Sequence, residues 1–208
     1  MKKVLLTLLL WCVAFSAQAE IVGQTSDGEY IHAYTADNGQ VIYFTALEEA
    51  PFVEKADVNF DGALDLVACV GQGASNYFFE FYVWDGSRYA YAPHEGIGYG
   101  LCNYRLYPEK GLVLSHANNG FAGALHEVCL FKWEGTALQM IRRAVSDLDN
   151  EYIWYDDGYA LRSYDNRLHV TVSGRALSGE WETLLEENVP LADDSWYARE
   201  ESALWQGL

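Results

Sequence analysis

The sequence predicts an all-β protein of antiparallel hairpins, in a propeller-like or sandwich architecture, with a short C-terminal helix. Polar residues followed by glycine recur along the chain and favour tight turns, because glycine accepts a positive φ. The segments between these turns are rich in aromatic and β-branched residues, which favour strands. The predicted turns are Asp27-Gly28, Asn38-Gly39, Asp61-Gly62, Asp85-Gly86, Lys110-Gly111, Glu134-Gly135 and Asp157-Gly158. The predicted strands include Tyr30–Tyr34, Val41–Thr45, Tyr77–Trp84, Leu101–Leu106, Val128–Trp133 and Leu168–Val172.

The amino end has the pattern of a secretory signal peptide. Lys2 and Lys3 precede an apolar run from Val4 to Phe15, and Ala17-Gln18-Ala19 provides a cleavage site before Glu20. The run is too short to span a bilayer, which takes about 20 residues. We therefore expect a secreted or periplasmic protein with no membrane insertion and no lipid anchor.

Composition and charge narrow the class of protein further. The chain has 208 residues, of which 50% are hydrophobic and 15% aromatic, so it can bury a sizeable core. We expect a signal peptide over residues 1–19 and a single all-β domain over residues 20–208. The formal net charge of −17 disfavours nucleic acid and anionic membrane surfaces as partners, and it favours a basic protein.

The segment from Asp57 to Asp65 has the spacing of a calcium loop. Asp57, Asn59 and Asp61 stand at positions one, three and five, Ala63 at position seven can offer its main-chain carbonyl, and Asp65 at position nine can ligate directly or through water. Gly62 allows the chain to reverse with a positive φ. This oxygen-rich set predicts calcium as a bound ion, whereas the alternative is an ordinary Asp-Gly turn with solvated acidic residues.

The flanks of this loop indicate strands. Position twelve is Ala68, so the bidentate glutamate of a helical EF-hand is missing. Pro51–Ala56 and Leu66–Val70 both read as short apolar strands. The loop is therefore predicted at the tip of a β-hairpin.

The expected exported chain keeps an odd number of cysteines. Cys69 lies within an apolar strand and is expected to be a small buried hydrophobe. Cys102 and Cys129 are the possible disulfide pair, but spacing in the sequence does not decide whether they are bonded.

No grouping in the sequence predicts catalysis, and we expect a protein that is not an enzyme. The histidines lack the paired spacing of a zinc site, and no nucleophile elbow or phosphate-binding glycine loop is present. Ser115 and His116 are neighbours on a predicted strand and so point to opposite faces. The histidines are His32, His94, His116, His126 and His169.

Two other groups of side chains have a structural and a functional interpretation. The carboxylate pairs Glu48-Glu49 and Asp156-Asp157 are expected to be solvated surface rather than glycosidase acids. Several aromatic residues could form a platform on which a carbohydrate stacks, although packing against a sheet is the expected use. These residues are Tyr89, Tyr91, Tyr99 and Trp154.

A weak repeat and one helix complete the predicted elements. Trp84-Asp85-Gly86 and Trp133-Glu134-Gly135 each end an aromatic strand, at a separation near that of propeller blades. At the C-terminus, Asp193, Asp194 or Ser195 can cap a helix with Trp196, Ala203 and Leu204 on one face. We expect this helix to cover an edge or end of the β structure.

From Ala50 to Arg143 the chain resembles FG-GAP or VCBS-type calcium-loop proteins. The resemblance lies in the Asp-x-Asn-x-Asp-Gly-x-x-Asp loop between two strands and the aromatic strand Tyr77–Trp84 that follows. The segments Leu112–Ser115, Asn118–Gly123 and Glu127–Trp133 are similar to a narrower exported group. That group contains bacterial immunity proteins against peptidoglycan-degrading effectors, with a propeller-like fold that resembles lysozyme inhibitors.

The resemblance implies both a metal site and a partner-binding loop. The implied calcium ligands are Asp57, Asn59, Asp61, Asp65 and the carbonyl of Ala63. The implied inhibitory loop is Ser115–Gly123, and its expected contact residues are Ser115, Asn118, Asn119 and Phe121. We therefore expect a calcium-binding module that inhibits a basic cell-wall hydrolase, or alternatively a carbohydrate-binding or envelope-associated module.

Overall fold

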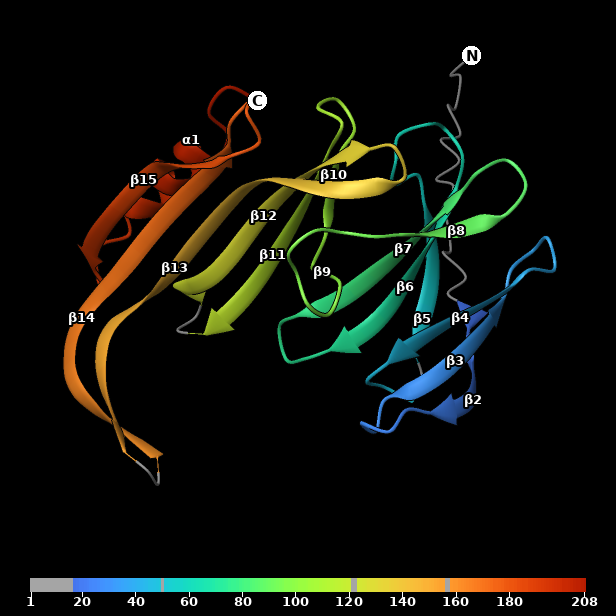
Figure 1. The fold of residues 1–208 in the computed structure, drawn as a ribbon, viewed down its shortest axis with the longest axis horizontal. Helices are drawn as coiled ribbons and strands as arrows, with labels where there is room; N and C mark the ends of the chain where they lie inside the picture. The colour runs from blue at the N-terminus through green and yellow to red at the C-terminus, as the bar shows by residue number, and fades with distance from the viewer. Residues whose placement is uncertain (1–16, 50, 121–122, 156–157) are drawn as a thin grey trace, which may run out of the picture.

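The protein folds as three antiparallel β-sheets with one short C-terminal helix, which confirms the predicted class (Figure 1). The computed structural model describes residues 17–49, 51–120, 123–155 and 158–208. The described strands form open sheets and no closed propeller. The strands of the first six-stranded sheet are β1 (Ala17–Gln18), β5 (Phe52–Ala56), β6 (Asp65–Gln72), β7 (Tyr77–Trp84), β8 (Tyr89–Ala92) and β9 (Leu101–Cys102). Those of the second are β10 (Arg105–Tyr107), β11 (Leu112–Gly120), β12 (Leu125–Glu134), β13 (Ala137–Tyr155), β14 (Gly158–Arg175) and β15 (Trp181–Pro190).

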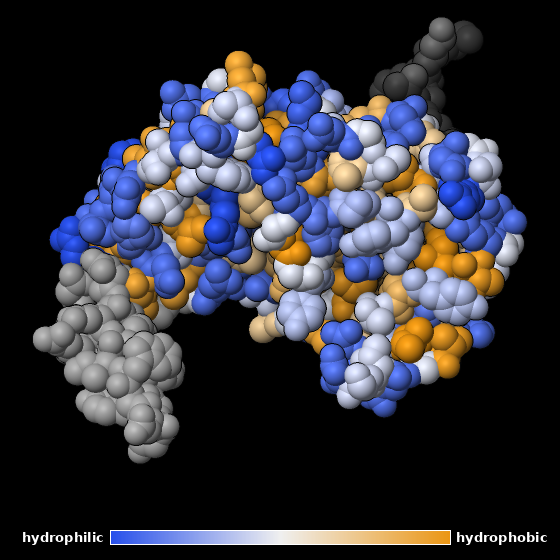
Figure 2. All heavy atoms as spheres, in the orientation of Figure 1, coloured by the Kyte–Doolittle hydropathy of each residue, from blue (hydrophilic) through white to orange (hydrophobic). Residues whose placement is uncertain are grey.

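The remaining three strands form a small sheet that packs on the first six-stranded sheet. They are β2 (Glu20–Gln24), β3 (Tyr30–Thr35) and β4 (Val41–Ala46). In β4 the side chains alternate between exposed and buried, and its inward residues Ile42 and Phe44 pack with Leu66 and Tyr82 of the first sheet. The outer face of the small sheet keeps exposed apolar residues, and Figure 2 shows hydrophobic residues near it on a mainly hydrophilic surface.

The main core lies between the two six-stranded sheets. Phe81 and Val67 of the first sheet pack with Phe131 and Leu138 of the second, and all four side chains are at most 1% exposed. Strand β6 is therefore buried on both faces, and only its last residue, Gln72, is exposed. A strand covered on both sides reads as a continuous apolar run, which explains the sequence Leu66–Val70.

The helix α1 (Trp196–Leu204) covers the outer face of the second sheet. Its buried face contains Trp196, Ala203 and Leu204, as predicted. It packs on the face formed by β13, β14 and the edge strand β15, which are the last strands of this sheet. The second sheet is apolar on both faces, so its outer face also needs a cover.

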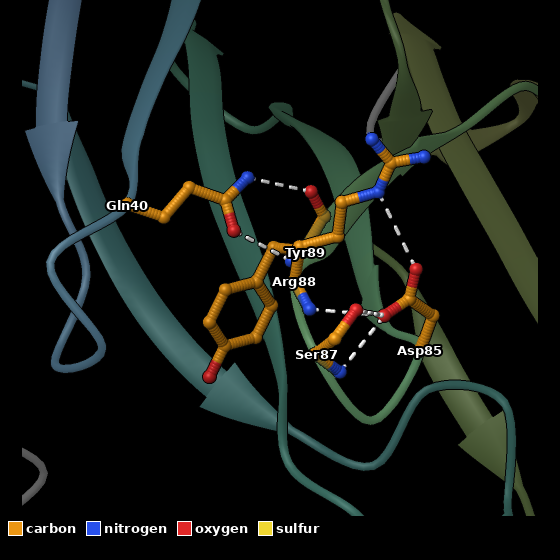
Figure 3. A network of polar contacts seen from close by, with 5 residues as sticks. All are labelled: Gln40, Asp85, Ser87, Arg88 and Tyr89. Carbon is orange, nitrogen blue, oxygen red and sulfur yellow. Dashed lines mark hydrogen bonds and ion pairs between the residues drawn. The ribbon is translucent and has the colours of Figure 1, made fainter.

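The two Trp-acid-Gly motifs occupy equivalent positions in the two large sheets. Trp84 ends β7 and Trp133 lies at the end of β12, and each strand continues through a turn into the next antiparallel strand. Figure 3 shows the first of these turns. The Asp85 carboxylate accepts hydrogen bonds from the Arg88 main-chain amide at 2.9 Å, the Ser87 hydroxyl at 2.8 Å and the Ser87 main-chain amide at 2.9 Å. These bonds lower the pKa of Asp85 to about 2.

The same view shows how the small sheet is attached to the first large sheet. The Gln40 side chain donates to the Tyr89 carbonyl and accepts from the Tyr89 amide, both at 2.7 Å (Figure 3). One side-chain amide thus replaces a pair of main-chain strand contacts. It fixes the turn before β4 against the edge strand β8.

The run Leu101–Leu106 was predicted as one strand, and this prediction was wrong. The run divides into β9 in the first sheet and β10 in the second. Asn103 lies between them with a φ of 42°, a left-handed conformation that ends a strand. The Asn103 side chain also accepts from the Tyr77 amide and donates to the Ser75 carbonyl, which stabilises the bend.

The described amino end begins as a strand. Ala17 and Gln18 form β1 and pair with Val53 and Phe52, while Ala19 is 8% exposed. The apolar run that precedes them lies outside the described residues. Within the described part of the chain, no helix has the length and apolar character needed to cross a membrane.

Candidate functional site

The loop from Asp57 to Leu64 connects β5 to β6 at the tip of a hairpin, as predicted. It is anchored in the main core through Val58, whose side chain is fully buried. The carbonyl of Val58 accepts a hydrogen bond from Trp133 Nε1 at 2.7 Å, and Trp133 belongs to the second sheet. The loop therefore joins the two large sheets as well as closing its own hairpin.

Within the loop, side-chain oxygens gather around main-chain amides. The Asp57 carboxylate accepts from Asp61 N at 3.1 Å and from Gly62 N at 3.0 Å. The Asn59 side-chain oxygen also accepts from Asp61 N at 3.1 Å, and Asp61 Oδ1 accepts from Ala63 N at 2.8 Å. Because Asp57 and Asn59 share a donor, their oxygens lie close together on the solvent side of the turn.

Two residues of the loop have left-handed backbone conformations. Gly62 has a φ of 88°, as predicted for the reversal of the chain. Phe60 has a φ of 66°, which is unusual for a bulky side chain and costs about 1–3 kcal/mol. The ring of Phe60 packs against the main core, and this packing helps to hold the strained backbone.

Asp65 has a different role from the other acidic residues of the segment. It is fully buried, and its two carboxylate oxygens accept from Val58 N at 3.0 Å and from Trp84 N at 2.8 Å. Burial raises its pKa, the two amide donors oppose that rise, and the charge of Asp61 adds to it. Asp65 thus fixes the loop from inside the core.

The donor set on the solvent side fits part of a calcium site. Asp57 and Asp61 supply carboxylates, Asn59 an amide oxygen and Ala63 a main-chain carbonyl, whereas calcium takes six to eight oxygens. Among the described residues, no group of three or more His, Cys, Asp or Glu side chains is placed to hold a metal. An ion at this loop would therefore need water molecules to complete its shell.

The predicted partner loop is only partly exposed. Ser115 is 5% exposed, and its hydroxyl accepts from Cys102 N at 2.9 Å and donates to Cys102 O at 3.3 Å. Asn118 is half-buried, Asn119 is exposed, and Phe121 lies outside the described residues. Asn119 is therefore the described contact candidate that solvent reaches.

The backbone of this loop is held by a residue that sequence reasoning missed. The side chain of Asn76 donates to Asn118 O and accepts from Asn118 N, both at 2.9 Å. Since Asn76 precedes β7, this contact ties the end of β11 to the first sheet. The loop is therefore presented on a rigid support.

A buried ion pair between β12 and α1 was also missed. His126 Nε2 lies 2.8 Å from Glu200 Oε1, and the side chains are 4% and 7% exposed. His126 Nδ1 lies 2.9 Å from the Gly123 carbonyl. Because both partners are acceptors, the ring satisfies both contacts as an imidazolium. The His126 ring also stacks on Trp196 at 5.5 Å.

The three cysteines in the described part of the chain, Cys69, Cys102 and Cys129, are buried in strands. Cys69 is 2% exposed in β6, as predicted. Cys102 and Cys129 are free thiols in the structure, and burial raises the pKa of Cys102 to about 11 and that of Cys129 to about 12. Both thiols are therefore protonated at neutral pH and poor nucleophiles.

The remaining acidic and aromatic candidates lie apart from the Asp57–Asp65 loop in the sequence. Glu48 Oε1 accepts from the Gln72 amide, and Glu49 Oε1 accepts from the Tyr30 hydroxyl at 2.9 Å. Asp156 and Asp157, and the side chain of Trp154, lie outside what the structure describes. Tyr91 and Tyr99 are exposed, while Tyr89 is half-buried.

Comparison with known proteins gives no relative for this chain. No family model, no curated protein and no solved structure matches it.

Proposed function

We propose that this protein is an exported, calcium-stabilised binding module that catalyses no reaction. The observation that supports this proposal is the loop of Asp57, Asn59 and Asp61, whose oxygens gather at the junction of the two large sheets through Val58. Calcium would be held by these side chains and the Ala63 carbonyl, and it would neutralise the charges of Asp57 and Asp61. Asp65 would support the ligands from the core, or reach the ion through water.

The proposed effect of the ion is to stabilise the hairpin and its contact with the second sheet. A ligand that binds only the folded state stabilises it by RT ln(1 + [L]/Kd). At a calcium concentration 100 times the Kd this amounts to about 2.7 kcal/mol. Chelation should therefore lower the melting temperature.

The test compares two Asp-Gly turns of the same sheet. Calorimetry should detect calcium binding to the wild-type protein and to Asp85→Asn, in which the β7–β8 turn is altered. Asp61→Asn should lose both the binding and the chelator-dependent shift in melting temperature. If a chelator leaves wild-type melting unchanged and calorimetry records no binding, the ion proposal is wrong.

We propose a protein partner for the end of the β11–β12 hairpin, of the basic cell-wall hydrolase type. Support comes from the exposed Asn119, the Asn76 support behind Asn118, and the net charge of −17, which would steer a basic protein. An inhibitor of this type inserts a rigid loop into the cleft of its enzyme. The module itself would then need no catalytic residue.

A binding assay with a purified basic peptidoglycan hydrolase tests this partner. Association should slow as salt rises, because rim charges act mainly on the association rate. Asn119→Ala should weaken binding, whereas Asn38→Ala, an exposed asparagine in the β3–β4 turn, should not. Absence of binding at low salt, or equal effects of the two substitutions, would count against the partner loop.

A further inference from the structure

We infer that the protein has an oligosaccharide-binding cleft beside the glycine-rich connection from β8 to β9. Two hollows meet there and share Gly96 and Arg143 as common walls. One has a volume of 340 Å³ and includes Trp181 and Ser173 in its lining, and the other has 290 Å³ and includes Tyr99 and Asn119. Each is close to the lower end of the range for small-molecule sites, so together they suit an elongated ligand.

The connection from β8 to β9, which lines both hollows, is fixed at both ends by contacts with neighbouring strands. At its start, Pro93 O accepts from Leu138 N at 2.8 Å, and Glu95 N donates to Leu138 O at 3.0 Å. At its end, Gly100 has a φ of 101°, and a Cβ there would lie 2.6 Å from the Phe79 carbonyl oxygen. The connection is thus tied to β13 and to β7, which makes the wall of the cleft a preformed surface.

Each of the two hollows has an exposed aromatic side chain in its lining, Trp181 in one and Tyr99 in the other. Trp181 is 43% exposed and Tyr99 is 65% exposed, although both are large and apolar enough to be buried. The Arg175 guanidinium lies over the Trp181 ring, 5.4 Å from its centroid, in a cation–π contact. The apolar C–H face of a sugar ring packs on exposed aromatic faces of this kind.

The charged groups of the cleft are paired and balanced. Arg143 Nε donates to Glu127 Oε1 at 2.6 Å, and Arg175 pairs with Glu95. Of these four residues Glu95, Glu127 and Arg143 line the hollows, and Arg175 neutralises Glu95 from beside the cleft. Each carboxylate is thus paired with a guanidinium, so the cleft does not share the strongly negative balance of the whole chain. Fixed guanidinium and carboxylate groups offer both donors and acceptors, which matches the hydroxyl groups of a saccharide.

The main chain adds to this polar surface. Gly96 and Gly98 both line the second hollow, and without side chains they leave the main-chain amides and carbonyls accessible to a ligand. The ligand class that combines flat apolar faces with many hydroxyl groups is an oligosaccharide of two or more rings. This inference does not depend on calcium. The cleft shares Asn119 with the proposed partner loop, so its test uses Trp181 and Tyr99, which are not part of that loop.

Titration with three tetrasaccharides tests the cleft, namely β-linked glucose, β-linked N-acetylglucosamine and galacturonic acid. Calorimetry and tryptophan fluorescence should detect binding of at least one of them. Binding of the first two would identify neutral glycans, whereas binding of galacturonate alone would identify acidic glycans held by Arg143. Trp181→Ala and Tyr99→Ala should each raise the Kd roughly tenfold, as expected for truncation of an aromatic anchor.

Tyr43→Ala is the matched control, because Tyr43 is 64% exposed on the small sheet and far in sequence from the cleft. It should leave the Kd unchanged, and melting curves should show that all three variants are folded. The inference is overturned if none of the tetrasaccharides binds, or if binding persists unchanged in both cleft variants.

Discussion

Two buried carboxylates, Asp65 and Glu200, are stabilised in different ways. Asp65, at the start of β6, has its carboxylate bound by two main-chain amides. Glu200, on α1, is bound by the ring of His126 from β12. Main-chain amides do not titrate, so they stabilise the Asp65 carboxylate at any pH at which it is charged. The His126–Glu200 pair, in contrast, requires a protonated imidazole. The first site is therefore expected to tolerate pH changes that weaken the second.

The largest effect should come from His126→Ala. This change leaves the buried Glu200 without its partner, and breaking a buried pair costs about 3–5 kcal/mol. Denaturant unfolding should report this loss, and Trp196 should become more accessible to fluorescence quenchers because it stacks on His126.

The Arg199–Glu187 ion pair is a control on the same helix. It lies 3.0 Å apart with side chains 43% and 22% exposed. Arg199→Ala should cost less than about 1 kcal/mol, as expected for a surface pair. Similar losses for His126→Ala and Arg199→Ala would contradict the role of burial.

Asp65→Asn should have a smaller but clear effect. An asparagine can accept from Val58 or Trp84 but not from both, and its own amide group would face the second donor. An unsatisfied buried donor costs about 1–3 kcal/mol, and we expect a loss of about 2 kcal/mol in the free energy of unfolding. With a chelator present, Asp61→Asn on the exposed side of the same loop should change stability by less than about 0.5 kcal/mol.

The smallest expected effect is the change of stability with pH, which should distinguish the His126–Glu200 pair from Asp65. Burial lowers the pKa of His126, but the hydrogen bonds to Glu200 and Gly123 and the charge of Glu200 outweigh it, so the pKa is raised above 6.5. Stability from this site is fully present below about pH 6.5, the value of unfolded histidine, and is lost as pH rises through the folded pKa.

Unfolding measured from pH 6 to pH 9 should therefore show declining stability in the wild type. Glu200→Gln should flatten this decline.

His116, which packs edge-on against His126 at 5.6 Å, has a lowered pKa because of burial and the charges of His126 and Arg105. Its stabilisation is present above about pH 6.5 and is lost as pH falls, so His116→Phe should remove that opposing trend. If stability still declines with pH in Glu200→Gln, another titrating group causes the decline.

The separation in sequence between contacting residues explains how much of the structure could be predicted. The Asp57–Asp65 loop was predicted at a hairpin tip because its residues are close in sequence and the turn needs a positive φ, which Gly62 provides. The His126–Glu200 pair spans 74 residues, and no local pattern predicts it. The break at Asn103 was missed because strand-forming residues such as Leu101 and Tyr104 stand on both sides of it. Only the different sheets that receive β9 and β10 require the bend.

The candidate sites follow the same rule. The positions of Asp57, Asn59 and Asp61 could be predicted, but the inward orientation of Asp65 depends on the amide of Trp84, which comes from another strand. Ser115 was predicted as a surface contact and is instead bonded to Cys102 in the interior. Tyr99 was a candidate for carbohydrate stacking, but the cleft itself could not be predicted. Its lining residues Tyr99, Arg143 and Trp181 come from segments far apart in the sequence.

The order of strands in the sheets has a consequence for the assembly of the chain during synthesis. Apart from β1 and β9, each strand pairs with a strand adjacent to it in sequence. Each sheet can therefore form from its own segment as soon as that segment emerges, with little loop-closure entropy. The contacts of Trp133 with Val58 and of Glu200 with His126 span long stretches of chain, so they form last and join layers that already exist.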